Sequence, residues 1–201
     1  MIKDSTILGI DPGTNILGYG VIRVEGGRPH YVTMGVFDLR KLRDPYEKLV
    51  NINAGVEELV AEYHPDALAV ESPFMGKNAQ VVLKLGRAQG AAIIAAVREG
   101  ISVHEYAPSQ AKIAICGNGL ASKNQVAMMV EKTLGIDIDP EYLDATDALA
   151  IALCHFYQSS NPFSSSRGKG DWKSFIAHAI RPKDAGFFAA FAFFLPQSAS
   201  V

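Results

Sequence analysis

The sequence predicts an α/β fold, built on a mixed five-stranded sheet with helices on both faces. Three apolar segments within residues 5–39 follow one another with only turns between them, which is typical of an antiparallel meander. Two more apolar segments, at 67–71 and 101–107, alternate with helix-patterned stretches, which is typical of parallel strands. Apolar residues make up 48% of the 201 residues, so the chain can fill a core without disulfides.

The expected strands and helices follow one another along the chain. The meander comprises residues 5–11, 17–25 and 29–39, and Gly26 with Gly27 supplies the turn between the last two strands. The segment 143–157 is apolar nearly all round, so this helix should be buried. Ser122 is a predicted N-cap. The predicted helices are 45–63, 78–99, 108–116, 122–134 and 143–157.

The composition changes after residue 158. Residues 159–170 are rich in serine and glycine, as in a linker, and the apolar run 185–195 is too short to cross a bilayer. We therefore expect a folded domain over 1–158 and a linker with a C-terminal tail over 159–201. The pattern leaves open whether the tail is a packing element, a partner-binding segment or a disordered end.

The N-terminal residues and the cysteines suggest where the protein works. The first residues contain no long apolar run, so we expect no signal peptide. No run reaches the roughly 18 consecutive apolar residues that a membrane helix needs. Cys116 and Cys154 lie in apolar, helix-like contexts, as in a reduced protein. These features predict a cytoplasmic protein that does not bind membranes.

Four carboxylates lie where carboxylates are costly. Asp11 and Glu71 each close an apolar strand, and Asp144 and Asp147 lie three residues apart at the start of the buried helix. Any one of them alone could be an ordinary turn or surface acid. Together they predict a hard divalent cation such as Mg²⁺, because several buried carboxylates require neutralisation and Mg²⁺ prefers oxygen ligands.

Basic residues are concentrated in one part of the chain. The formal net charge is −2, which does not indicate nucleic-acid binding, but residues 72–132 hold seven Lys or Arg against three acids. Solvated surface charge is one explanation of this stretch. Contacts to the phosphates of a nucleic acid are the other.

Four segments of the chain resemble, in order, the signature regions of the bacterial RuvC family of Holliday-junction resolvases. They read GIDPGTNILGYGVI, AVESPFMGKNAQVVLKLGRAQGAAIIAAV, EYAPSQAKIAICGNGLASKNQV and DATDALAIALCH, and the resemblance covers about residues 6–158. It implies an RNase H-like fold and a homodimer. It also implies a crossover junction endodeoxyribonuclease, a hydrolase that makes paired symmetric, metal-dependent nicks in four-way junction DNA during recombination and repair.

The resemblance also implies roles for individual residues. The catalytic, metal-binding acids of the family fall on Asp11, Glu71, Asp144 and Asp147, which implies two Mg²⁺ ions per active site, with Mn²⁺ as an alternative. Phe74 matches an aromatic residue that stacks on a base near the junction centre. RuvA and RuvB, which migrate the junction, are the implied protein partners. The expected DNA-binding residues are Phe74, Lys77, Lys84, Arg87, Lys112 and Lys123.

Three other functions remain open. The turn after Asp11 is similar to the first phosphate loop of actin and sugar-kinase ATP-binding folds, although no second such loop follows. An RNase H-like nuclease that acts on another nucleic acid would share the same acids. A junction-binding module without catalysis is the third alternative, and the four acids argue against it.

Overall fold

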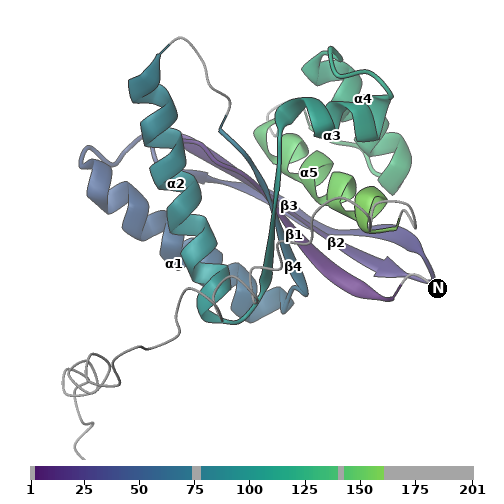
Figure 1. Ribbon diagram of the computed structural model, residues 1–201, viewed down its shortest axis with the longest axis horizontal. Coiled ribbons are helices and arrows are strands. Elements are labelled where there is room, and N and C mark those ends of the chain that lie inside the picture. The colour runs from purple at the N-terminus through teal and green to yellow at the C-terminus, as the bar shows by residue number, and fades with distance from the viewer. Residues whose placement is uncertain (1–2, 74–77, 140–142, 161–201) are drawn as a thin grey trace, which may run out of the picture. The chain divides into compact units, whose positions relative to one another are not determined.

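The computed structural model describes residues 3–73, 78–139 and 143–160 of the chain, and Figure 1 shows their arrangement. The described part contains five strands and five helices, as predicted. The strands are β1 (Ser5–Asp11), β2 (Ile16–Glu25), β3 (Arg28–Asp38), β4 (Ala67–Glu71) and β5 (Ser102–Tyr106). The helices are α1 (Pro45–Tyr63), α2 (Ala79–Arg98), α3 (Pro108–Cys116), α4 (Lys123–Leu134) and α5 (Leu143–Ser159).

The strands form one mixed sheet in the order β3-β2-β1-β4-β5. The first three strands form the antiparallel meander, whereas β4 runs parallel to β1 and β5 runs parallel to β4. Because β1 and β4 are adjacent and parallel, their carboxyl ends lie at the same edge of the sheet. This confirms the predicted mixed five-stranded sheet.

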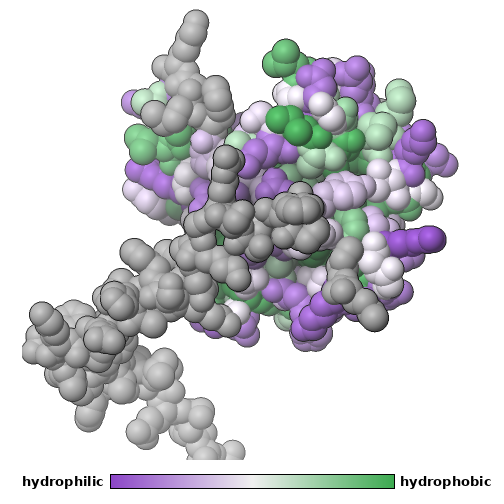
Figure 2. Space-filling model, turned by 45° about the vertical axis from the view of Figure 1, so that its right-hand side comes forward, coloured by the Kyte–Doolittle hydropathy of each residue, from purple (hydrophilic) through white to green (hydrophobic). Residues whose placement is uncertain are grey.

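Helices cover both faces of the sheet (Figure 1). Successive side chains of β1 point to opposite faces. Leu8 and Ile10 join a cluster with residues of α1 and α2, whereas Ile7 joins a cluster with residues of α3, α4 and α5. Large apolar side chains remain exposed over the α3–α4 layer, where Figure 2 shows hydrophobic surface. They are Ile113, Leu120 and Met128.

Helix α5 lies unusually close to the sheet because glycines face it. A Cβ atom at Gly9 would lie 2.1 Å from the carbonyl oxygen of Ala148, and one at Gly18 would lie 2.1 Å from that of Asp144. Both distances are far below any real contact, so only glycine fits. The helix itself is buried nearly all round, as its apolar sequence predicts.

Helix α2 has one buried face and one open face. Asn78 caps its first turn, and its side chain accepts hydrogen bonds from the backbone N–H groups of Gln80 and Val81. By length and composition this helix could cross a membrane, although it carries Lys84 and Arg87. It packs its alanine face in the core of the domain instead, through Ala88, Ala92, Ala95 and Ala96.

Candidate active site

Two of the predicted acids end neighbouring strands. Asp11 is the last residue of β1, and Glu71 is the last residue of β4. The register pairs Ile10 with Val70, so Asp11 and Glu71, the next residues of the two strands, lie side by side at the edge of the sheet. Such an edge, at the carboxyl ends of adjacent strands, is where α/β sheets form their sites.

The first turns of α5 bring two more acids to Asp11. One carboxylate oxygen from each of Asp11, Asp144 and Asp147 lies within 4.8 Å of the other two. Gly18 makes this approach possible, because it pairs with Asp11 across the sheet and its missing side chain leaves room for the backbone of Asp144. Glu71 lies outside this three-acid group.

Burial and mutual repulsion make ionised acids costly here. Burial, followed by the charges of Glu71 and Asp147, raises the pKa of Asp11 to about 8. Burial, followed by the charge of Asp147, raises the pKa of Glu71 to about 7. Glu71 is thus electrostatically part of the cluster, and the four acids need a positive charge among them.

Lys123 supplies one such charge. Its Nζ atom lies 2.7 Å from Asp147 Oδ2 and 3.4 Å from Asp144 Oδ1. Lys112, on α3, also lies close enough for its charge to lower the pKa of Glu71. The structure therefore brings these two predicted DNA-binding lysines to the acids.

A buried glutamine, which the sequence analysis missed, supports the end of β4. Gln89 on α2 is 8% exposed, and its Nε2 donates to Glu105 Oε2 at 2.9 Å and to the backbone oxygen of Glu71 at 3.3 Å. Ser72 Oγ donates to the same Glu105 oxygen at 3.4 Å. The signal in the sequence was a polar residue on the alanine-rich face of a helix. We call Gln89, Glu105 and Ser72 the Gln89 clamp.

The remaining predicted DNA-binding residues are Phe74, Lys77, Lys84 and Arg87. Phe74 and Lys77 lie outside the described residues. Lys84 and Arg87 line a hollow between α1 and α2, next to the turn that follows Asp11.

The three grouped acids, Asp11, Asp144 and Asp147, fit a divalent cation. Every ligand they offer is a carboxylate oxygen, which suits a hard cation such as Mg²⁺ better than a soft metal. Lys123 lowers the pKa of both Asp11 and Glu71, and Lys112 lowers that of Glu71, yet burial and the neighbouring acids keep both pKa values raised. The group can therefore hold metal and leave coordination positions for a substrate phosphate.

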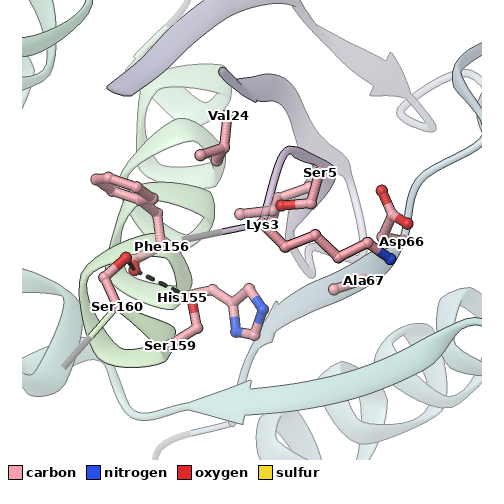
Figure 3. A pocket seen from close by; sticks show the side chains of 10 residues that line it. Lys3, Ser5, Val24, Asp66, Ala67, His155, Phe156, Ser159 and Ser160 are labelled. Atoms are coloured by element: carbon pink, nitrogen blue, oxygen red, sulfur yellow. Dashed lines mark hydrogen bonds between the residues drawn. The ribbon is translucent and has the colours of Figure 1, made fainter. Parts of the chain in front are cut away.

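A second hollow, of about 620 Å³, lies at the opposite end of β1 (Figure 3). His155 points into it from the end of α5, and its Nδ1 lies 2.7 Å from the hydroxyl of Tyr106. Burial, with the neighbouring His104, lowers the pKa of His155 to about 4, so the ring is neutral at pH 7. Lys3, Ser5 and Asp66 also line this hollow, which shares no residue with the acid cluster.

Comparison with known proteins places this arrangement among DNA-junction enzymes. The family model described as crossover junction endodeoxyribonuclease RuvC matches residues 7–155. A crossover junction endodeoxyribonuclease RuvC from Bacteroides fragilis is 51% identical over 178 residues, which cover 88% of this chain and 94% of that protein.

Solved structures agree with the sequence comparison. The RuvC structure from Thermus thermophilus superposes with a TM-score of 0.69 at 37% identity, covering 77% of this chain and 95% of that one. The T. thermophilus RuvC in complex with Holliday junction substrate gives a TM-score of 0.68 at 35% identity, with the same coverage. The RNase H-like fold expected from the sequence is thereby confirmed.

Proposed function

The chain belongs to the RuvC family of crossover junction endodeoxyribonucleases, and from this membership we propose that the protein resolves Holliday junctions by paired symmetric nicks during DNA recombination and repair. The observation that carries the proposal is the convergence of Asp11, Asp144 and Asp147 at the sheet edge. An ATP-binding fold would need a second phosphate loop, which the chain does not provide.

The proposed catalytic acids are Asp11, Glu71, Asp144 and Asp147, and they would hold two Mg²⁺ ions, which Mn²⁺ can replace. Bound there, the ions would activate a water molecule for in-line attack and stabilise the departing 3′ oxygen, leaving 5′-phosphate and 3′-hydroxyl ends. Asp11 would be the central acid of this set, because it is close to both Asp144 and Asp147 and is affected by the charge of Glu71.

The lysines have two tasks in this proposal. Lys123 holds the carboxylates of Asp144 and Asp147 through its ion pairs. Together with Lys112 it also adds positive charge where the scissile phosphate would lie. Such phosphate contacts position a DNA strand without reading its sequence. The proposed stacking of Phe74 on an unpaired base would hold the junction centre open.

Two symmetric cuts require two active sites related by a two-fold axis, so we propose a homodimer. The open face of α2 supports this proposal. Leu83 is 63% exposed and Ile94 is 49% exposed. A Cβ atom at Gly86 or Gly90 would meet nothing within 4 Å. A second copy of the same face would cover these apolar residues and approach closely over the glycines. From family membership alone we also propose that the protein acts in the cytoplasm with the branch-migration proteins RuvA and RuvB.

The test of the function is cleavage of a synthetic mobile four-way junction in Mg²⁺, with a linear duplex of the same sequence as the control. The wild-type protein should make paired nicks at symmetric positions in the junction and leave the duplex intact. Asp11→Asn should abolish cleavage and still bind the junction, because the basic residues are untouched. Cleavage of the duplex alone, or full activity of Asp11→Asn, would contradict the proposal.

The dimer is tested separately by light scattering during gel filtration. The wild-type protein should elute at twice the monomer mass. Ile94→Glu places a charge on the open face of α2 without touching the core, so it should elute as a monomer with an unchanged circular dichroism spectrum. An unaltered dimer in this variant would place the interface elsewhere.

A further inference from the structure

A basic hollow of about 410 Å³ lies between the N-terminal halves of α1 and α2. Its floor includes Thr14 and Asn15, in the turn that follows Asp11. Its walls carry four cationic side chains, two from the α1 side and two from α2. They are Arg43, Lys48, Lys84 and Arg87.

Among the residues that the structure describes, no acidic side chain lines this hollow. Within the ranges that the structure describes, Arg43, Lys84 and Arg87 form no ion pair, whereas Lys123 beside the acid cluster forms two. The nearest acid in sequence, Asp44, is engaged as the N-cap of α1 and accepts from the N–H of Tyr46 at 2.9 Å. The positive charge of the hollow is therefore not balanced by its own lining.

Lys48 joins the hollow to the acid cluster. Its Nζ donates to the backbone oxygen of Thr14 and to Asn15 Oδ1, both at 2.9 Å. These two residues follow Asp11 by three and four positions. The wall formed by α1 is thus fixed to the turn that ends the catalytic strand, and the hollow has a defined position relative to the proposed cutting site.

We propose that the basic hollow binds the phosphate backbone of one duplex arm of the junction, outside the crossing point. The inference rests on the proposed function and adds Arg43, which precedes α1, and Lys48 of α1 to the DNA-binding surface. The occupant is a nucleic-acid backbone because four cations along one open hollow match a repeated negative charge, and duplex DNA carries one charge per roughly 1.7 Å of its axis. A contact of this kind orients the arm without reading bases.

The hollow would therefore act on orientation rather than on chemistry. An arm held between α1 and α2 enters the acid cluster from the side of the Thr14–Asn15 turn. Because Lys48 fixes that turn, the angle of the arm and the position of the scissile phosphate are set together. Loss of a wall cation should weaken junction binding.

The experiment measures binding of a fluorescent four-way junction without divalent metal, in the Asp11→Asn background, so that no strand is cut. Arg43→Ala is the variant, because this side chain is exposed and has no described ion-pair partner. Arg28→Ala is the matched control, since it removes the same charge at the β2–β3 turn, at the other end of the sheet. Binding is followed as a function of salt, with long-armed and short-armed junctions.

Arg43→Ala should bind long-armed junctions more weakly than Arg28→Ala does. The slope of log K against log salt should fall by about 1, and the affinity ratio of wild type to variant should shrink about threefold between roughly 50 and 200 mM salt. With arms cut back to a few base pairs, the difference between the two variants should disappear.

Equal effects of Arg43→Ala and Arg28→Ala would overturn the inference, since only net charge would then matter. An effect of Arg43→Ala that persists on short arms would overturn it too, because the contact would lie at the crossing. Free nucleotide should inhibit junction binding equally in wild type and Arg43→Ala. Inhibition that depends on Arg43 would indicate a small-molecule site and would overturn the inference. None of these outcomes affects the proposed function, which is tested separately by junction cleavage.

Discussion

Helices α5 and α2 are both long and rich in alanine, yet they meet their surroundings in opposite ways. In α5, 11 of 17 residues are buried, whereas in α2 only 5 of 20 are. The glycines that face α5 leave no room for a methyl group, and the glycines within α2 at 86 and 90 face open space. Helix α5 therefore fixes the acids inside the domain, and α2 divides its residues between the core, the Gln89 clamp and an outer surface.

The difference teaches that the same small residues serve two purposes. Opposite α5 they create a close approach within one chain, which brings Asp144 to Asp11. On α2 they leave a smooth face that becomes useful only when a second molecule covers it. Four substitutions test this contrast, two at each helix.

The largest effect is expected from Gly18→Ala, which would break the close packing of α5. The new methyl would lie 2.1 Å from the carbonyl oxygen of Asp144, so the first turn of α5 must move. Overpacking of this kind costs about 3 kcal/mol of unfolding free energy. Displacing Asp144 by even 1 Å should lower cleavage by about 100-fold.

Thermal unfolding and single-turnover cleavage measure the two effects of Gly18→Ala. Junction binding by this variant without metal should stay close to wild type, because the basic residues lie on other elements. Normal cleavage in a stably folded Gly18→Ala protein would show that the close packing does not set the geometry of the acids.

A smaller effect is expected from Gln89→Leu, on the buried face of α2. The substitution removes the Gln89 amide donor from the Glu105 carboxylate, which keeps Ser72, and from the Glu71 carbonyl, at a cost of about 1–3 kcal/mol. Because the end of β4 loses its support, we expect kcat to fall about tenfold, as loss of positioning does, with junction affinity unchanged. The double variant Gln89→Leu with Glu105→Leu should regain stability, and additive losses in the pair would contradict the clamp.

A pH-dependent effect of about 2 kcal/mol is expected at the far end of α5. His155 has a pKa of about 4 in the folded protein, against an ordinary value of 6.5, because it is buried. The unfolded chain therefore binds more protons between these values, and this contribution to stability is lost as the pH falls from about 7 to 5, by about 2 kcal/mol.

Urea unfolding at several pH values compares wild type with His155→Gln, which can still accept from Tyr106. The unfolding free energy of wild type should fall relative to that of His155→Gln as the pH drops below 6.5. The comparison removes the opposite contributions of Asp11 and Glu71, whose raised pKa values favour the folded state at lower pH. Parallel pH profiles for the two proteins would rule out His155 as the source.

The smallest effect is expected from Gly90→Ala, on the open face of α2. In a helix that faces solvent, alanine stabilises by about 1 kcal/mol relative to glycine. In the proposed dimer, the methyl would disturb the close approach of two copies. The dimer should therefore dissociate at a several-fold higher protein concentration, while the monomer gains stability. Sedimentation at a series of concentrations measures the first effect and chemical unfolding the second; an unchanged dimer would separate this glycine from the interface.

The sequence predicted most of the secondary structure because its periodicities were strong and its turns were marked. The four acids were also identifiable, since each ends or begins an apolar segment. What it could not predict were contacts between distant elements. The role of Gly18 depends on which helix crosses β2, and the Gln89 clamp depends on α2 passing over the end of β4. The ion pairs of Lys123 and the link from Lys48 to the turn after Asp11 likewise arise only from tertiary packing.

The placement of two acids on α5 also has a consequence for the newly made chain. Asp11 leaves the ribosome early, whereas α5 is the last element described, so the acids meet only when synthesis has passed it. Translation adds about 5–20 residues per second, so seconds pass between the two events. During that interval the emerging polypeptide carries its basic residues but not an assembled acid cluster, so the proposed active site forms only after most of the described domain has been made.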